Sequence, residues 1–290
     1  MKNAVLSFIA MLLICPVCLA KVTSKERKAL LDVYEHAGGA HWNTPWNLEA
    51  AVETWHGVTV KDGHVVALDL FRNNLIGNIP ESIGRLKYLT YLNLGFNTLD
   101  GPIPIQLTEL ENLVTLKLEM NRLQGPIPME MGNMRSLEEF TAFNNVLEGS
   151  IPESMGQLEN LRILNLSSNA LDGAIPEAIG SLDKLEVLGL FGNRLKGELP
   201  TSLGQLTQLK ELVLSNNGFT GKIPESFDQL AQLEIFQIQN NGFTDFKVIE
   251  AMQERSFLAF DSDMDSRPNF RKFDATRMAD TKFDDDDEND

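Results

Sequence analysis

Cysteine and histidine are scarce in this chain, and their positions exclude several kinds of chemistry. The two cysteines, Cys15 and Cys18, both lie in an apolar stretch near the N-terminus. If that stretch is a leader that is removed, the mature chain has no disulfide, thiolate metal site or cysteine nucleophile. The four histidines all precede residue 65, so the rest of the chain has no imidazole for acid–base chemistry.

The histidines are also poor candidates for a metal site. Their spacings are irregular, and no cysteine or cluster of acids accompanies them, whereas a zinc site needs several such ligands. We therefore favour structural or surface roles over zinc binding, and we predict neither a metal nor a cofactor. The four residues are His36, His41, His56 and His64.

Positive charge is in short supply as well. The chain has 25 Lys and Arg against 41 Asp and Glu, which gives a formal net charge of -16. A protein of this charge repels the phosphate backbone, so we expect no general nucleic-acid binding. Hydrophobic residues make up 43% of the chain, which is enough to bury a core.

The N-terminal stretch has the pattern of a secretory leader. An apolar run over residues 5–14 follows Lys2 and ends before Pro16, with Cys18 and Ala20 as small residues before a cleavage point. This pattern predicts a signal peptide over residues 1–20 and a secreted, extracellular protein. The alternative is an uncleaved membrane anchor, but the run is shorter than the roughly 20 residues that a spanning helix needs. No later segment is long and apolar enough to cross a membrane.

The rest of the chain is dominated by a repeat of 24 residues. Eight copies extend over residues 65–244, and the last copy is degenerate. Each copy has a Leu-x-x-Leu-x-Leu stretch, an asparagine, and a Leu-x-Gly-x-Ile-Pro stretch. Such periods predict a solenoid in which each coil buries its leucines against its neighbours. The asparagine column reads Asn73, Asn97, Asn121, Asn145, Asn169, Asn193, Asn217 and Asn241.

Each part of the repeat has a physical reading. The Leu-x-x-Leu-x-Leu stretch alternates as a strand does, and stacked coils join these strands into one parallel sheet. The inward asparagine carries a donor and an acceptor for backbone groups of neighbouring turns. The Gly-x-Ile-Pro part predicts a turn and a second short extended piece. The Leu-Gly-x-Leu part predicts one or two helical turns on the outer side.

The full motif resembles the plant-specific class of leucine-rich repeats over residues 65–244. That class includes receptor-kinase ectodomains, receptor-like proteins and polygalacturonase inhibitors. The resemblance implies an α/β solenoid: a right-handed leucine-rich-repeat superhelix with a parallel concave β-sheet, a helical N-terminal cap and a short C-terminal cap helix. It also implies a ligand-binding protein of defence, signalling or adhesion type.

Residues 21–64 are predicted to form the N-terminal cap. We expect a helix from Ser24, its capping residue, to about residue 36, ended by Gly38 and Gly39. Trp42, Trp46 and Trp55 are suited to plug the open end of the core. The stretch from Trp55 to Val58 resembles the Trp-x-Gly-Val segment of the family's cap. The family flanks this segment with a cysteine pair, and here Glu53 and Val60 stand instead, so no cap disulfide is expected.

The C-terminal cap is predicted over residues 245–260. Asp245 is suited to cap a helix from about residue 246 to 257, with Phe246, Ile249 and Met252 packed on the last coil. Residues 261–290 have 11 acids and 5 bases without apolar periodicity, which predicts a disordered, solvated acidic tail. The alternatives are weak binding of calcium or of a basic protein.

The candidate ligand-binding residues lie at the strand positions that are not leucine. These positions face outward on the concave side of the sheet, and aromatic side chains beside polar ones are typical of interface hot spots. The alternative is that the aromatics pack only on side chains of neighbouring strands. The candidates are Phe71, Tyr91, Phe96, Lys117, Glu119, Glu139, Phe143 and Phe191.

A catalytic constellation is missing from the pattern. Glu119 and Glu139 are roughly 13 Å apart along adjacent strands, farther than the roughly 5–10 Å of glycosidase carboxylates. Glu139 and Lys117 have the pattern of a cross-strand ion pair. No Gly-rich phosphate loop or Gly-x-Ser-x-Gly elbow is found. We therefore expect a binding protein and no enzyme.

The sequence thus predicts a secreted recognition module that binds a protein, peptide or glycan on its concave face. One alternative is an inhibitor of a secreted hydrolase, similar to polygalacturonase inhibitors, and another is a structural wall or matrix protein. Asn165 begins an N-glycosylation sequon on a concave strand. A glycan there would direct a ligand to the N-terminal half of the face. The oligomeric state is not indicated by the sequence.

Overall fold

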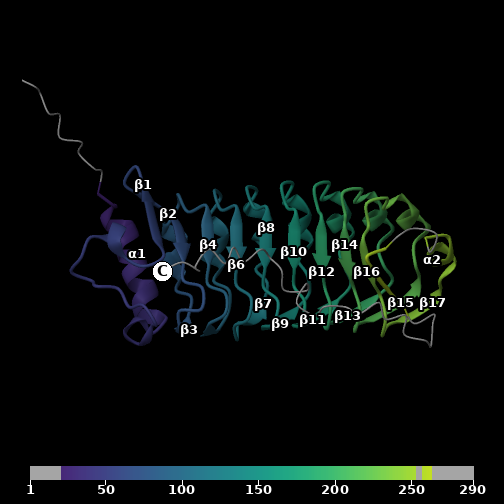
Figure 1. Ribbon diagram of the computed structural model, residues 1–290, viewed down its shortest axis with the longest axis horizontal. Coiled ribbons are helices and arrows are strands. Elements are labelled where there is room, and N and C mark those ends of the chain that lie inside the picture. The colour runs from purple at the N-terminus through teal and green to yellow at the C-terminus, as the bar shows by residue number, and fades with distance from the viewer. Residues whose placement is uncertain (1–20, 253–256, 263–290) are drawn as a thin grey trace, which may run out of the picture.

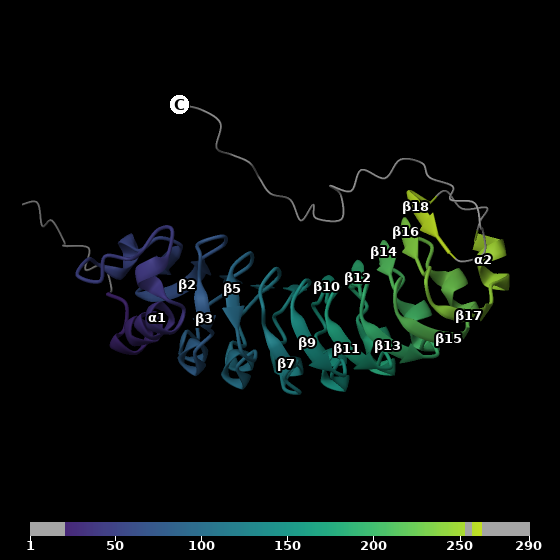
Figure 2. The same cartoon turned by 90° about the horizontal axis from the view of Figure 1, so that it is seen from below.

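The computed structural model describes residues 21–252 and 257–262. They form a curved solenoid in which a ten-stranded sheet lines the inner side (Figures 1 and 2). The first two strands of this sheet are antiparallel, and the others are parallel. Its strands are β1 Val58–Lys61, β2 His64–Asp69, β4 Tyr91–Asn93, β6 Thr115–Lys117, β8 Glu139–Thr141, β10 Ile163–Asn165, β12 Val187–Gly189, β14 Glu211–Val213, β16 Ile235–Gln237 and β18 Ala259–Asp261.

Short strands after the Leu-x-Gly stretch form narrower parallel sheets behind the inner one. A six-stranded sheet holds the later coils and a two-stranded sheet the first ones. They confirm the second extended piece of the repeat. Their strands are β3 Ile76–Asn78, β5 Thr98–Asp100, β7 Gln124–Pro126, β9 Val146–Gly149, β11 Ala170–Gly173, β13 Arg194–Gly197, β15 Gly218–Lys222 and β17 Gly242–Asp245.

The outer side of each of the first seven coils carries a single short 3-10 helix, and the eighth coil carries an α-helix there (Figure 2). The prolines of the Ile-Pro motif fit just before most of these helices, because the first turn needs no backbone N–H from them. The outer helices are Glu81–Arg85, Ile105–Glu109, Met131–Asn133, Glu153–Gln157, Glu177–Ser181, Thr201–Gln205 and Glu225–Gln229. Two more, Gly39–His41 and Val52–Thr54, lie in the N-terminal region.

The register of the inner sheet places residues 24 positions apart side by side. Tyr91 pairs with Thr115, Thr115 with Glu139, and Glu139 with Ile163. The residue that follows each of them in its strand points inward, is fully buried, and belongs to one continuous core. Every surface column of the inner sheet is therefore a row of residues that share one position of the repeat.

The N-terminal end of the core is closed by helix α1, Ser24–His36, and by the three tryptophans. Trp46 lies between the rings of Trp42 and Trp55, with ring centroids 4.9 and 4.7 Å away. All three indole rings are buried, as expected for a plug. The helix cap differs from the prediction: Thr23 caps the helix in place of Ser24, because Glu26 completes a capping box with it.

The C-terminal end also differs from the prediction. Helix α2 is described over Lys247–Met252, and its first backbone N–H is bound by the Asp245 carboxylate at 3.1 Å. Residues 253–256 lie outside the described residues, so the predicted end of this helix near residue 257 stays a prediction, whereas the cap helix up to residue 260 is wrong, because residues 259–261 form β18 and pair with β16. Phe260 packs on Phe236 with ring centroids 5.9 Å apart. The apolar side chains continue the 24-residue period by one more strand.

Two predicted segments lie outside the described residues. They are the signal peptide over residues 1–20 and the acidic tail, apart from its first two residues. Asp261 belongs to β18, so the predicted start of the tail at residue 261 is wrong. No helix among residues 21–252 is long and apolar enough to cross a lipid bilayer.

Candidate functional site: the concave face

The concave face is built from the outward columns of the ten-stranded sheet. On the inner side of the coils, the asparagine column fixes the positions of these strands by hydrogen bonds to their backbone. The side chain of Asn121 accepts a hydrogen bond from the backbone N–H of Leu99 at 3.0 Å. It donates to the carbonyls of Leu94, Leu118 and Glu119 at 2.9 to 3.1 Å. Because one side chain bridges two coils, the ladder holds the strands in register while their outward side chains differ.

An aromatic corner lies at the start of the face, made by Phe71, Arg72 and Phe96. The rings of Phe71 and Phe96 meet edge to face with centroids 5.1 Å apart. The guanidinium of Arg72 lies 6.0 Å from the centroid of the Phe71 ring. Both phenylalanines are half-buried. Edge-to-face and cation–π contacts of this kind hold aromatic side chains in fixed orientations.

The backbone at this corner is unusual. Three positions of each coil face outward on the concave side, and the third of them makes a column over Phe71, Gly95, Glu119, Phe143, Ser167, Phe191, Ser215 and Gln239. The residue that follows this third outward column has a positive φ in every coil. Later coils place Asn144, Gly192 or Asn216 there, residues that adopt this conformation easily. In the second and third coils the position holds Phe96, with φ 56°, and Met120, with φ 54°. For such side chains the left-handed conformation costs roughly 1–2 kcal/mol, so the early coils keep bulky groups at a conformational cost.

A polar centre occupies the next strands. Lys117 on β6 and Glu139 on β8 form an ion pair with 3.2 Å between Nζ and Oε1, and each side chain is 18% exposed. This confirms the cross-strand pair that the sequence indicated. On β4 the hydroxyl of Tyr91 accepts a hydrogen bond from Asn93 at 3.2 Å. Burial, followed by the negative charge of Asp69, raises the pKa of Tyr91 above its ordinary value.

Glu119 is not available to a ligand, although the sequence placed it on the binding face. Its side chain is 4% exposed, and its carboxylate accepts a hydrogen bond from the Thr141 hydroxyl at 2.5 Å. A side chain at Gly95 would collide with this carboxylate, because a Cβ there would lie 2.8 Å from Oε1. Burial raises the pKa of Glu119, and the hydrogen bond from Thr141 opposes that rise. Glu119 and Glu139 have separate partners and do not form an acid–base pair.

The remaining candidates, Phe143, Phe191 and Asn165, lie further along the face, away from the aromatic corner. Phe143 and Phe191 are half-buried in the third column, two coils from each other. Asn165 is half-buried on β10, where its side-chain oxygen accepts a hydrogen bond from the backbone N–H of Ser167 at 3.1 Å. Its glycosylation stays a prediction.

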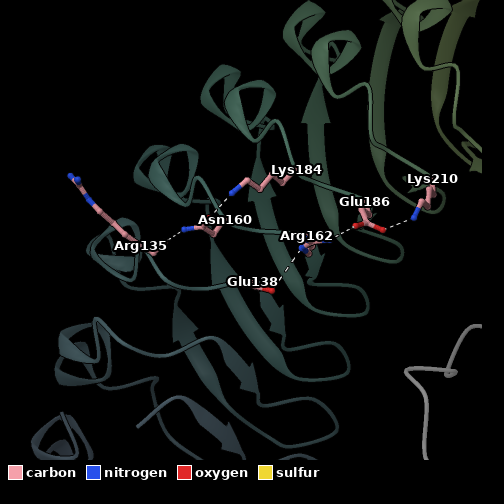
Figure 3. Close-up of polar contacts among 7 residues, drawn as sticks. All are labelled: Arg135, Glu138, Asn160, Arg162, Lys184, Glu186 and Lys210. Atoms are coloured by element: carbon pink, nitrogen blue, oxygen red, sulfur yellow. Dashed lines mark hydrogen bonds and ion pairs between the residues drawn. The ribbon is translucent and has the colours of Figure 1, made fainter. Parts of the chain in front are cut away.

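A charged rim borders this half, at the position just before each inner strand. The signs alternate along it: Glu138, Arg162, Glu186 and Lys210 follow one another in successive coils (Figure 3). Glu186 is held by Arg162 at 2.9 Å and by Lys210 at 2.6 Å. The hydrogen bond from Lys210 lowers the pKa of the Glu186 carboxyl. Beside the rim, Lys184 Nζ donates a hydrogen bond to Asn160 Oδ1 at 2.6 Å. Sequence reasoning missed this rim, which the 24-residue alternation of charge signs would have indicated.

All four histidines lie in the N-terminal region, and His64 is the first residue of β2. His64 stacks on Tyr88 with ring centroids 3.6 Å apart, and its Nδ1 lies 3.4 Å from the buried carboxylate of Glu26. Within residues 21–252 and 257–262, no group of three or more His, Cys, Asp or Glu side chains is arranged to hold a metal ion.

The sequence matches two family models of leucine-rich repeats. The model described as "Leucine-rich repeat region" matches residues 67–174. The model described as "Leucine Rich Repeat" matches residues 184–206 and 208–230. Together these matches include more than half of the chain.

Several proteins with similar sequences or structures are receptors or receptor-like proteins. Receptor-like protein 36 of Arabidopsis thaliana is 41% identical over 80 residues, which are 28% of this chain and 11% of that protein. The ectodomain of the Arabidopsis receptor kinase GASSHO1/SCHENGEN3, solved with CASPARIAN STRIP INTEGRITY FACTOR 2, is 32% identical with a TM-score of 0.72. That match covers 75% of this chain and 27% of the ectodomain chain.

The Arabidopsis receptor kinase HAESA, solved with the peptide hormone IDA and the co-receptor SERK1, is 27% identical with a TM-score of 0.61. The match covers 76% of this chain and 42% of HAESA. This chain therefore spans less than half the length of each of these relatives.

Proposed function

The chain belongs to the leucine-rich-repeat family, in the class of plant receptor ectodomains, and from this premise we propose that it is a secreted recognition module. Its concave face binds a protein or peptide ligand and performs no catalysis. The crystal structure of HAESA with a peptide hormone and a co-receptor supports a ligand of this class. The receptors named among the relatives support an extracellular location.

The aromatic corner is the observation that carries this proposal. Phe96 occupies a left-handed position that asparagine, glycine or serine fills from the fourth coil onward, so its ring is kept at a cost to the fold. Met120, 37% exposed, extends the same row in the next coil. Apolar groups held in strained, partly exposed positions are suited to anchor a partner, because the contact with the partner offsets their cost.

The arrangement of the acids supports a binding protein over an enzyme. Glu139 is neutralised by Lys117, and Glu119 is buried under the sheet surface. Neither offers a carboxylate positioned for proton transfer to a substrate. A hydrolase inhibitor and a matrix protein remain the alternatives, and a glycan remains an alternative ligand on the same face.

Affinity capture tests the proposal. The full mature chain is immobilised and exposed to extracellular extract from its source, and the retained molecules are identified by mass spectrometry. The variant Phe96→Asp removes the corner while keeping a residue that tolerates a positive φ. The matched control Ile105→Asp places the same charge on an apolar residue of the outer side, which is 49% exposed.

A partner retained by the wild type and by Ile105→Asp, and lost from Phe96→Asp, is the expected result. The identity of this partner then separates the alternatives, since a hydrolase indicates an inhibitor. Circular dichroism confirms first that all three proteins fold. An identical set of retained molecules from all three proteins would contradict the proposal, and so would the absence of any retained partner.

A further inference from the structure

An apolar strip, made by Ile163, Val187, Val213 and Ile235, lies on the C-terminal half of the concave face. Ile163 pairs with Val187 across β10 and β12. Glu211 on β14 pairs with Val187 on one side and with Ile235 on the other. Val213 lies two residues along β14, on the same face as Glu211. One carboxylate is thus surrounded on three sides by aliphatic side chains.

Among the described residues, none supplies a counter-charge to Glu211. In the part of the chain that the structure describes, no hydrogen bond or ion pair involves its carboxylate, although the side chain is half-buried. Its sequence neighbour Lys210 points to the rim, where it binds Glu186 at 2.6 Å. Glu139 occupies the same column three coils earlier and is paired with Lys117 at 3.2 Å. The two acids share a position of the repeat and differ in having a cation.

An unpaired carboxylate in such surroundings is unfavourable. Burial among the apolar side chains raises the pKa of Glu211, and the nearby charge of Glu234 raises it further. A partly desolvated charge is stabilised when a group of opposite charge reaches it. The aliphatic side chains around Glu211 cannot provide such a group, so a positive charge has to come from a bound partner.

We infer that Glu211 and the apolar strip form a subsite for a lysine or arginine side chain of a peptide ligand. The cationic end binds the carboxylate of Glu211, and the methylene stem packs on Val187 and Ile235. A neutral apolar side chain would leave the carboxylate unpaired, and an acidic one would be repelled. The inference rests on the proposed function and names the chemistry that one part of the concave face recognises.

Two end-blocked pentapeptides provide the test. One has the sequence Gly-Leu-Lys-Leu-Gly, and the other carries norleucine in place of lysine, which keeps the stem and removes the charge. The full mature chain, labelled at isoleucine and valine methyl groups, is titrated with each peptide and followed by NMR. We expect the lysine peptide to shift the methyl signals of Val187 and Ile235. It should bind about fivefold to tenfold more tightly than the norleucine peptide, the scale of a partly desolvated ion pair.

Two variants make the test specific. Glu211→Gln should abolish the preference for lysine while both peptides still bind weakly. Glu225→Gln, a change of the same charge at an exposed residue of an outer helix, should keep the preference. The inference is overturned if Glu211→Gln retains the preference, if Glu225→Gln loses it equally, or if the strip signals do not shift.

The two proposals fail in different ways. If capture through Phe96 succeeds and the lysine preference is absent, the subsite alone is wrong. If the lysine preference depends on Glu211 and no partner is captured, the subsite stands and the aromatic corner does not.

Discussion

The early and late coils of this solenoid share one backbone and carry different surfaces on it. Early in the chain the equivalent rim positions are uncharged: Val66 lies within β2, and Thr90 and Val114 lie just before β4 and β6. The concave face there has an aromatic corner and the ion pair of Lys117 with Glu139. Later the rim alternates in charge, and the face becomes apolar around Glu211. The repeat constrains the inward columns, because these must pack on like columns, and leaves the outward columns free to differ.

The largest expected contrast concerns the asparagine ladder, which is buried in the early coils and half-buried in the late ones. Asn145→Ala removes the acceptor of the Leu123 N–H and the donor to the Leu118 carbonyl. Because these buried backbone groups then have no hydrogen-bond partner, we expect the free energy of unfolding to fall by about 2–4 kcal/mol. Asn193→Ala should cost about half as much, because water reaches the freed groups. Urea unfolding followed by circular dichroism measures both.

An exposed asparagine serves as the control for this comparison. Asn112 donates to the Lys87 carbonyl at 2.8 Å from the surface. Asn112→Ala should change the stability by less than about 0.5 kcal/mol. Equal losses from Asn145→Ala and Asn193→Ala would show that the depth of the ladder does not matter.

The second contrast concerns acids whose pKa shifts have opposite signs. Burial raises the pKa of Glu119, so this group favours the protonated folded state. Its contribution makes the fold less stable as the pH rises from the unfolded carboxyl pKa through the raised folded pKa. Glu119→Gln should remove that loss and stabilise the protein at pH 7, on the order of 1 kcal/mol.

Glu186 is the matched acid of the late coils. Its lowered pKa means that its contribution is present above the unfolded carboxyl pKa and is lost as the pH falls through the folded pKa. Glu186→Gln should therefore destabilise the protein at pH 7, by at most about 1 kcal/mol. Urea midpoints of both variants at pH 7 and pH 4 decide the matter. Shifts of the same sign at pH 7 would contradict this interpretation.

The smallest expected effect concerns the left-handed position that follows the third outward column. Met120→Asn introduces the residue that the next coil carries there as Asn144. Release of the conformational cost should raise the stability by roughly 0.5–1 kcal/mol. Asn216→Met, the reverse change in a late coil, should lower it by a similar amount. Thermal unfolding of the two variants provides the measurement, and a loss of stability in Met120→Asn would count against strain in the early coils.

Most of the fold was predictable because its columns are periodic. The inner strands, the second extended pieces, the outer helical turns and the tryptophan plug all follow from residue types at a fixed spacing. The last strand was missed because Phe257 and Phe260 continue the period without a leucine or an asparagine. The capping residue was displaced by one position, since Thr23 is three residues before Glu26 and Ser24 has no such partner.

The site was less predictable, because outward side chains respond to neighbours 24 residues away. Glu119 sinks into the sheet because Gly95 leaves room beside it and Thr141 supplies a hydroxyl. Phe71 is partly covered by Phe96, and Lys117 and Glu139 neutralise each other. These outcomes depend on pairs of residues in adjacent coils, whereas a column gives only the position of each one.

The ladder also bears on how such a chain changes in length. From Asn97 onward, each ladder asparagine donates to backbone carbonyls of its own coil and of the coil before it, and these groups are present in every coil. Duplication or deletion of a whole 24-residue unit would therefore give every asparagine an equivalent set of partners. An insertion of one residue in a strand would misalign the ladder on both sides. Gene lineages of this architecture can thus lengthen or shorten the recognition surface in whole coils while the joints between coils stay the same.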